Sequence, residues 1–559
     1  MIINSQLGGK TPTGTKSITS NGVYDVTDFA SADVQVPTTA PAYYIEKTKD
    51  ANGVARNGSY LMDFSTFTDV GGYVFNSAYA YNNNITGSVS MPNLTQGTGA
   101  NGCTSMFQGC TGITSVDLGA LTTISGLYFS QKMFYQCTGI TSIDLSSLER
   151  VFGQYACDNM FYGCTGITGA IDLSSLVSVS GNVACSQMFD GCTSLTSVDL
   201  SSLEAISGSC YYMFHNCTGI TSVDLSSLVS VTGQAGGMFS NTSLTTVDLS
   251  SLVQVTGNNA FSGSFSGCTS LASVDISRLA KLGTNNTLPS TFMGCTSLTE
   301  LRFSGLPYTA TNINSAFNNT LKNVTGCTVH FPSDWATDMA NYSNITNGLG
   351  GTNTTVLFDL PAVTTLDLSS IKTAYASQFY PFANNNYFPN VTSVDLSSLT
   401  TVSGQQGCYQ MFQGCTGLTS VDLSSLTTVS DTSGCENMFS NCSGLTGAIN
   451  LSSLTTISGN NGFRNAFYNC TGITSVDLSS LTTVSGVSGC MTMFYGCTGL
   501  TELRFPSLTT VYNANVFSNM LADTSGVTVH FPSNFGTVVG AATLGGTGTT
   551  VLYDLPATA

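Results

Sequence analysis

A unit of 25 to 28 residues recurs along this chain of 559 residues and constrains the fold more than any other feature. The stretch from Met106 to Gly126 reads MFQGCTGITSVDLGALTTISG, and nearly the same letters return from Met133, Met188 and Met411. A fixed period of this size predicts stacked repeats, in which each unit packs only on its neighbours. We therefore expect one long, quasi-one-dimensional core.

Each unit has two halves with different patterns. In the first half, the Val-Asp-Leu triplet at 198–200 alternates apolar and polar residues, which predicts a short strand with its Asp pointing outward. In the second half, Cys185, Met188, Phe189 and Cys192 stand at i, i+3, i+4 and i+7, which predicts a short helical turn. Neither half can bury its apolar side alone, so stacking is required.

Two sequence patterns resemble a known family. The L-x-x-L-x-L spacing of residues 195–200 is that of leucine-rich repeats. The part Phe-x-x-Cys-Thr-x-Leu-Thr-x-Val/Ile resembles the BspA-like leucine-rich repeats of bacterial surface proteins and bacteriophage genomes. This resemblance covers about residues 58 to 559. It implies an α/β fold: a right-handed leucine-rich-repeat solenoid with one short parallel strand and a short helical or irregular turn per repeat.

The chain divides into three predicted parts. Residues 1–42 are not repeat and predict a small β segment, with strands at 15–20, 24–26 and 33–36. Residues 43–361 form a first array and 362–559 a second, because each ends in the same cap, TVHFPS followed by TTVLFDLP or TTVLYDLP. Four aromatic residues at the start of the second array are expected to seal the junction between the arrays rather than form an exposed patch: Tyr380, Phe382, Tyr387 and Phe388.

The N-terminal segment resembles short modules of phage structural proteins, whose pattern is ITxNGxYDVxxYxxVxVxVP. The match includes Asn21-Gly22, Tyr24, Asp25 and Phe29, and the resemblance makes the last three candidate attachment residues. A second interpretation, a β cap on the solenoid, stays open. The first ten residues have neither a basic start nor an apolar core, so no secretory signal is expected.

Composition excludes some classes of function. Only 8% of residues are charged and the net charge is −17, which argues against nucleic-acid binding. No apolar run approaches the roughly 20 residues of a membrane span, so no membrane insertion is expected. No nucleophile motif, phosphate loop or zinc-protease motif is present, and the repeated Asp offers one carboxylate environment only. The sequence therefore predicts a protein that is not an enzyme and has no cofactor.

Nineteen Cys fall almost entirely into two columns seven residues apart, such as Cys185 and Cys192, with Cys327 outside them. Residues seven apart on a helix are separated by about 10.5 Å, too far for a disulfide. The spacing fits no zinc motif. Buried free thiols are therefore predicted, as expected for a protein assembled in a reducing cytoplasm. His330 and His530 hold equivalent cap positions and predict a structural role.

The repeated Asp residues should line one face of the solenoid and are the candidate ligand residues. Carboxylates about 4.8 Å apart repel by roughly 1 kcal/mol in water. Ser/Thr hydroxyl and backbone N–H donors, cations such as calcium, or a ligand could offset this repulsion. Arg302 and Arg504 are expected to pair with the last Asp before each cap. The file comprises Asp117, Asp144, Asp172, Asp199, Asp224, Asp248, Asp275, Asp367, Asp395, Asp422 and Asp477, with Asn450 interrupting it.

The leading functional hypothesis is a bacteriophage virion-surface protein, such as a tail or head fibre, assembled in the host cytoplasm. Residues 1–42 would join it to other virion proteins, and the solenoid would bind a bacterial surface glycan or protein. Fibres are often trimers, so a homotrimer is one expectation. The alternatives are a BspA-like adhesin at the bacterial cell surface and a spacer or decoration protein that binds nothing. The outward positions of the repeats are monotonous, so the spacer stays open as an alternative.

Overall fold

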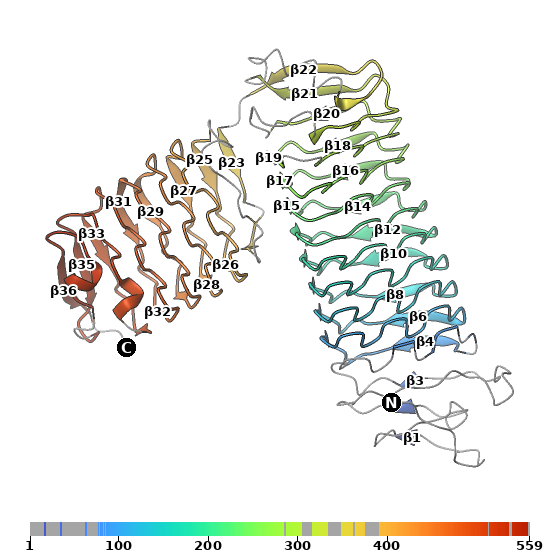
Figure 1. The fold of residues 1–559 in the computed structure, drawn as a ribbon, viewed down its shortest axis with the longest axis horizontal. Coiled ribbons are helices and arrows are strands. Elements are labelled where there is room, and N and C mark those ends of the chain that lie inside the picture. Colours follow the sequence, from blue (N-terminus) through green and yellow to red (C-terminus); the bar gives the residue numbers. More distant parts are fainter. Residues whose placement is uncertain are drawn as a thin grey trace.

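The computed structural model describes residues 85–283, 287–304, 316–333, 348–361, 364–369, 371–374, 391–512, 514–535 and 539–556, with a few single residues between and before these ranges. Near the N-terminus it describes only the strands β1 (Lys16–Ser17), β2 (Val34–Gln35) and β3 (Met62–Asp63). Parallel strands stack into two arrays of repeats (Figure 1). In the described part, no helix is long and apolar enough to cross a membrane.

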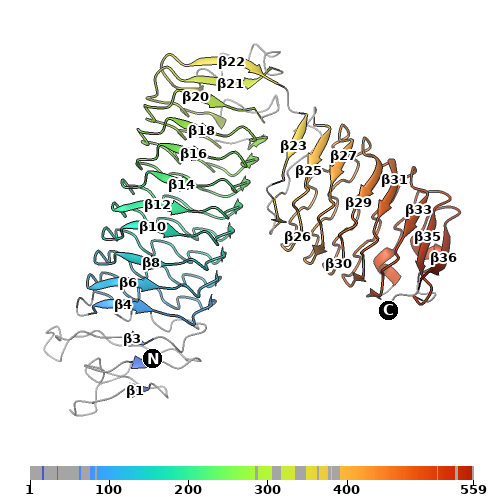
Figure 2. The same cartoon turned by 180° about the vertical axis from the view of Figure 1, so that it is seen from behind.

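Each repeat has three sides: a long strand, a short strand and a ribbon of turns. Long strands carry the Val-Asp pattern, with Val buried and Asp outward in β12 (Leu195–Asp199). Figure 2 shows the same stack from behind, with the long and short strands in separate rows. The parallel pairing in register, for example Val198 with Val223, confirms the predicted leucine-rich-repeat solenoid.

The long strands form the strand face. In the first array they are β4 (Gly87–Ser90), β6 (Ile113–Asp117), β8 (Ser142–Asp144), β10 (Gly169–Asp172), β12, β14 (Ser222–Asp224), β16 (Thr246–Asp248), β18 (Ser273–Asp275) and β20 (Glu300–Arg302). In the second they are β23 (Thr365–Asp367), β25 (Ser393–Asp395), β27 (Ser420–Asp422), β29 (Thr446–Asn450), β31 (Gly472–Asp477) and β33 (Glu502–Arg504).

The short strands form one parallel sheet in each array. The first comprises β5 (Gln96–Gly97), β7 (Thr123–Ile124), β9 (Arg150–Val151), β11 (Ser178–Val179), β13 (Ala205–Ile206), β15 (Ser230–Val231), β17 (Gln254–Val255) and β19 (Lys281–Leu282). The second comprises β24 (Thr373–Ala374), β26 (Thr401–Val402), β28 (Thr428–Val429), β30 (Thr456–Ile457), β32 (Thr483–Val484) and β34 (Thr510–Val511).

Of the two predicted forms, a helical or an irregular turn, the turn ribbon has the irregular one. Every fourth residue has a left-handed backbone, as at Asn101, Ser105 and Gly109, with φ of 56°, 52° and 71°. Such residues end a right-handed helix, so the chain makes successive turns instead. The Phe107 N–H donates across the stack to the Met133 carbonyl at 2.8 Å rather than within its own repeat. A turn every four residues also directs i, i+3, i+4 and i+7 inward.

Two side-chain ladders fill the core beneath the ribbon. Phe107, Phe134 and Phe161 stack with ring centroids 5.3 and 5.2 Å apart, and the ladder continues through later repeats. Beside it, the Cys164 thiol donates to the Phe134 carbonyl at 3.0 Å. The same thiol-to-carbonyl bond recurs from Cys110 to Cys497. All nineteen Cys are free and buried, which confirms the prediction made for them.

The two caps have the same structure, built from β21 (Thr328–Pro332) and β22 (Thr355–Leu360), then from β35 (Thr528–Pro532) and β36 (Thr550–Leu555). Near the second cap lie a 3-10 turn, Ala514–Phe517, and the helix α3 (Ala541–Leu544). Each cap carries a polar network of one Arg, one Glu, one His and one Asp. Its members are Arg302, Glu300, His330 and Asp359 in the first cap, and Arg504, Glu502, His530 and Asp554 in the second.

The prediction for Arg302 and Arg504 is wrong. Arg504 lies in register with Asp477, but its guanidinium pairs with Glu502 of its own strand at 2.6 Å, because outward residues two apart in a strand share a face. Arg302 pairs with Glu300 at 2.5 Å in the same way. Glu300 also contacts His330 of the first cap, and Glu502 contacts His530 of the second.

The second array begins against the side of the first. Val229, Val253 and Ala280, which precede three short strands of the first array, belong to the buried core cluster of the second array. Arg278 pairs with Asp367 at 2.7 Å across the same junction. We call Glu204, Val229, Val253 and Ala280 the junction surface. The aromatic residues predicted to seal it, among them Tyr380 and Phe388, lie outside the described residues.

The described strands near the N-terminus extend the strand face. Strands β1, β2 and β3 pair in parallel with one another, and β3 pairs with β4. β1 and β2 coincide with two of the three strands predicted for residues 1–42. The third prediction, residues 24–26, and the attachment candidates Tyr24, Asp25 and Phe29 lie outside the described residues.

Candidate functional site

The predicted Asp file lies outward along the strand face of both arrays. Members in paired strands are direct register partners, as Asp199 is with Asp224. Each carboxylate accepts a hydrogen bond from the backbone N–H two residues later, for example Asp224 Oδ1 from Ser226 at 2.9 Å. Ser226 also donates its hydroxyl to the same oxygen at 2.7 Å. These donors and the short Asx turn explain why the pattern repeats.

The file borders a shallow groove in the second array. One part, about 520 Å³, is lined by Asn450, Asp477, Glu502 and Arg504. A second part, about 400 Å³, is lined by Asp395 and Asp422 and shares Ala448 and Asn450 with the first. Among the described residues, no group of three His, Cys, Asp or Glu could hold a metal ion. The file members of the first array line the equivalent face.

The caps gather a second set of polar groups. His530 lies between Asp554 and Glu502, with Nδ1 2.7 Å from the first carboxylate and Nε2 3.3 Å from the second. His330 lies between Asp359 and Glu300 at 2.8 and 3.3 Å. Hydrogen bonds from these histidines hold the pKa of Asp359 and Asp554 below the usual range. The duplicated geometry fits the structural role predicted for both histidines.

The turn ribbon carries a different set of outward residues, which the sequence analysis missed. The position after the stacked Phe is Tyr135, Tyr162, Asp190 and His215 in four successive repeats, and then returns to Ser240. The rings of Tyr135 and Tyr162 stack with centroids 4.8 Å apart. We call this surface the turn face. The sequence carries a signal of this surface. When the repeats are aligned, bulky or charged residues stand in one column where other repeats have Ser, as at Ser240 and Ser266.

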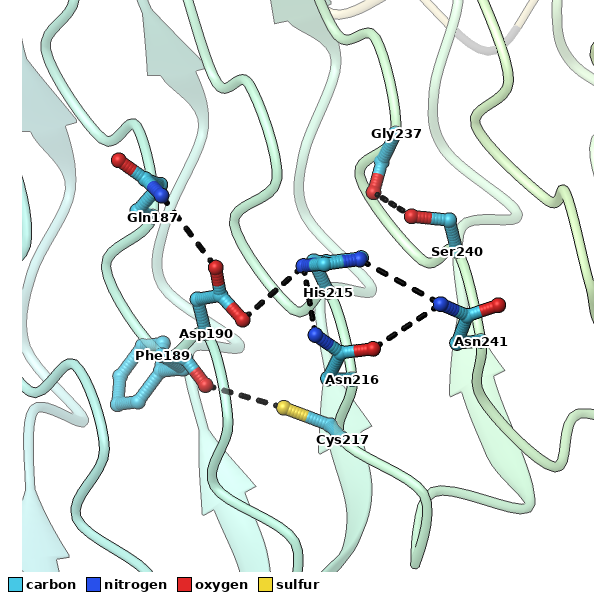
Figure 3. Close-up of polar contacts among 9 residues, drawn as sticks. All are labelled: Gln187, Phe189, Asp190, His215, Asn216, Cys217, Gly237, Ser240 and Asn241. Atoms are coloured by element: carbon cyan, nitrogen blue, oxygen red, sulfur yellow. Dashed lines mark hydrogen bonds and ion pairs between the residues drawn. The ribbon is translucent and has the colours of Figure 1, made fainter.

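Asp190 anchors a polar network on the turn face (Figure 3). Only 5% of Asp190 is exposed, whereas the file aspartate that follows it, Asp199, faces solvent. Its Oδ1 lies 3.1 Å from His215 Nδ1, and Gln187 Nε2 donates to Oδ2 at 3.4 Å. Asn216 and Asn241 complete the network, because Asn241 Nδ2 donates to Asn216 Oδ1 at 3.0 Å. The network presents amide, imidazole and carboxylate groups side by side.

A second carboxylate on this face is also enclosed. Asp158 accepts hydrogen bonds from Gln131 Nε2 at 2.9 Å and from Asn159 Nδ2 at 2.8 Å. Burial raises the pKa of Asp158, and its amide partners offset part of that rise. Asp158 and Asp190 lie outside the Asp file, so the prediction that the carboxylates share one environment is wrong.

The second array repeats the arrangement. Tyr468 and Tyr495 occupy the same column as Tyr135 and Tyr162, and their rings stack at 4.5 Å. The Tyr495 hydroxyl donates to Asp523 of the next repeat. This hydrogen bond raises the pKa of Tyr495 to about 12, so the hydroxyl stays protonated at neutral pH. Each array therefore carries a stacked Tyr pair followed by a carboxylate in the next repeat, although Ala522 and not Asp523 holds the position equivalent to Asp190.

The arrangement suits binding better than nucleophilic catalysis. His215 Nδ1 lies 3.1 Å from Asp190 Oδ1 and 3.0 Å from Asn216 Nδ2, and its Nε2 lies 3.5 Å from Asn241 Nδ2. The nearby hydroxyl and thiol are engaged elsewhere, because Ser240 donates to the Gly237 carbonyl and Cys217 to that of Phe189. No nucleophile therefore faces the imidazole among the described residues of this network, although an Asp–His pair alone could orient one.

Comparison with known proteins identifies the repeat. The model of the BspA type leucine rich repeat region matches residues 65–185, 128–264, 262–337 and 409–538. No curated protein matches the chain. A solved leucine-rich repeat protein from Bacteroides ovatus is 18% identical, with 77% of this chain and 87% of that chain covered and a TM-score of 0.24. The pneumococcal vaccine antigen PcpA is 13% identical, with 88% and 85% covered and a TM-score of 0.22.

Proposed function

The chain belongs to the BspA-type leucine-rich repeat family, and from this premise we propose that it is a non-enzymatic binding protein. Its solenoid holds outward side chains at fixed positions and presents the turn face to a bacterial surface glycan or protein. The observation that carries the proposal is the cluster of unlike residues in one column: Tyr135, Tyr162, Asp190 and His215. A spacer that binds nothing needs only residues such as Ser240, Ser266 and Ser440, which hold the same column in other repeats.

The buried state of Asp190 supports a built surface rather than random variation. Burying a carboxylate is costly unless it is hydrogen-bonded. Here Gln187 of the same repeat and His215 of the next provide the partners, so two adjacent repeats are matched to each other. Rigid surfaces of this kind bind without ordering a loop, which lowers the entropic cost of association.

Within this function we propose that the protein acts from a bacteriophage virion. The support is the N-terminal pattern around Tyr24, Asp25 and Phe29, which resembles phage structural modules. In this proposal residues 1–42 attach to other virion proteins, and the solenoid points to the host cell. The alternative is a BspA-like adhesin displayed by a bacterium, and membership of the family supports that alternative equally.

The test is a pull-down with the full chain against phage particles lacking it and against intact bacterial cells, with and without calcium. The virion proposal predicts binding to particles that a deletion of residues 1–42 abolishes. It also predicts binding to cells that the deletion leaves intact. Binding to cells alone would establish the adhesin, and binding to particles but not to cells would establish the spacer. Failure to bind either would refute the binding function.

A further inference from the structure

We propose that each array carries one binding site for a neutral polysaccharide on its turn face, and that the two sites act together. The inference rests on the proposed binding function and names its ligand class. The first site is Tyr135 and Tyr162 with Asp190. The second is Tyr468 and Tyr495 with Asp523. A stacked Tyr pair followed by a carboxylate occurs in both arrays, with Asp190 in the tyrosine column and Asp523 one position beyond it.

The chemistry of the trio matches hydroxyl-rich ligands. Tyrosine hydroxyls are donors and acceptors at neutral pH. The buried Asp190 does not face the ligand but holds His215 and Gln187 in place beside the tyrosines. In the first site the amides of Gln187, Asn216 and Asn241 surround Asp190 and His215 (Figure 3). Planar groups with two polar atoms can bond two neighbouring hydroxyls of a sugar at once. The partly exposed aromatic rings add apolar surface for the C–H faces of the sugar.

Charge selects a neutral ligand. The protein has a net charge of −17, and both trios include a carboxylate. An anionic polysaccharide would be repelled, and Lys132, the nearby cation, already lies 5.9 Å from the Tyr135 ring centroid. A protein partner would be expected to insert an anchor residue into a pocket, whereas these trios present polar edges in a row along the solenoid.

Periodicity favours a polymer over a single sugar. Side chains of one column recur at the spacing of stacked strands, roughly 4.8 Å, so a chain molecule lying along the axis meets the two tyrosines of a pair one after the other. Two sites on one rigid chain also raise affinity for a polymer through effective concentration, by about 10² or more, without new contacts.

The experiment is affinity electrophoresis of the full chain in native gels that contain mannan, dextran, starch, barley β-glucan or galactan, with dextran sulfate as the anionic comparison. Retardation by at least one neutral polymer is expected. Changing Tyr162→Phe or Tyr495→Phe should each weaken the apparent affinity about tenfold or more. These variants keep the stacked rings and remove only a hydroxyl. The double variant should abolish retardation.

The matched control is Tyr128→Phe with Tyr155→Phe. These rings stack at 4.8 Å, as the site pairs do, but lie in another column of the ribbon. The control should bind like the wild type. Equal loss in the control, retardation by dextran sulfate alone, or no retardation by any neutral polymer would overturn the inference. If cells are bound while no polysaccharide retards the chain, the proposed binding function stands and the glycan inference fails.

Discussion

Asn450 and Asp477 are register partners in adjacent strands, and their side-chain oxygens accept the same hydrogen bond from the backbone N–H two residues later. The distances are 3.0 Å to Ser452 N and 2.9 Å to Ser479 N. An amide thus replaces a carboxylate in the file with no change in local geometry. The hydrogen bond, and not the negative charge, is what the fold requires at this position.

We therefore predict that Asp422→Asn is neutral or slightly stabilising, because it keeps the acceptor and removes repulsion along the file. Asp422→Ala should lower the free energy of unfolding by about 1 kcal/mol, since the Ser424 N–H loses its partner. Denaturant unfolding measures both. Two outcomes would instead assign the file to cation binding. One is a loss of stability in the Asn variant equal to that in the Ala variant. The other is a calcium-dependent rise in the melting temperature that the Asn variant abolishes.

The thiol ladder should be sensitive to loss of its donor. Cys164→Ala removes the hydrogen bond to the Phe134 carbonyl and leaves a buried acceptor, which should cost about 1–3 kcal/mol. Cys164→Ser should cost less, because a hydroxyl can make the same bond. Thr320 does so in the last repeat of the first array, donating to the Leu288 carbonyl at 2.8 Å. Equal losses for the two variants would show that the thiol only fills volume.

The junction surface should be pH-sensitive through Glu204. Burial raises the pKa of Glu204 to about 7, although Lys372 and the backbone N–H groups of Lys372 and Thr373 act in the opposite direction. A carboxyl with a folded pKa above its unfolded value stabilises the fold below about pH 4.5, and this contribution is lost as pH rises toward about 7. The difference corresponds to about 3 kcal/mol.

Glu204→Gln tests this directly. Relative to the wild type, the variant should become progressively more stable between pH 5 and pH 8, as measured by thermal unfolding at matched ionic strength. Comparing the two proteins at each pH cancels the contribution of Lys281, whose pKa burial lowers to about 8. A stability difference that does not change with pH would show that Glu204 stays charged in the junction.

The caps should depend on their histidines. His530→Ala removes the group between Asp554 and Glu502, so the amides of β35 and β36 should exchange with deuterium faster while the central repeats are unaffected. His330→Ala should act in the same way on β21 and β22. Hydrogen exchange resolved by peptide measures both, and unchanged exchange in the caps would show that the networks are incidental to stability.

The sequence predicted the parts of the fold that depend on simple periodicity. The alternation of apolar and polar residues from Val198 to Leu200 predicted a strand. The period of 25 to 28 residues predicted that such strands stack in parallel. The spacing of Cys185 and Cys192 suggested a helix, because successive four-residue turns place the same positions inward. The better signal was conformational: Asn461, Asn465 and Asn469 stand four apart, and all three have left-handed backbones.

The parts that the sequence did not predict depend on contacts between distant segments. Val229, Val253 and Ala280 stand where the second array has Lys372 and then Thr, and all three pack into the core of the second array. Asp190 appeared as one more acidic residue until the structure placed His215 beside it. An alignment of the repeats could have marked the apolar junction residues and Asp190 as deviations. It could not have identified the second array or His215 as their partners.

The central claim is that the turn face binds, and the most direct measurement is the binding of intact bacterial cells by variants of that face. The account predicts that Tyr162→Phe combined with His215→Ala and Tyr495→Phe loses cell binding, while Tyr128→Phe with Tyr155→Phe retains it, at equal melting temperatures. Undiminished binding by the first variant would contradict the account and return the solenoid's binding surface to the strand face or the N-terminal segment.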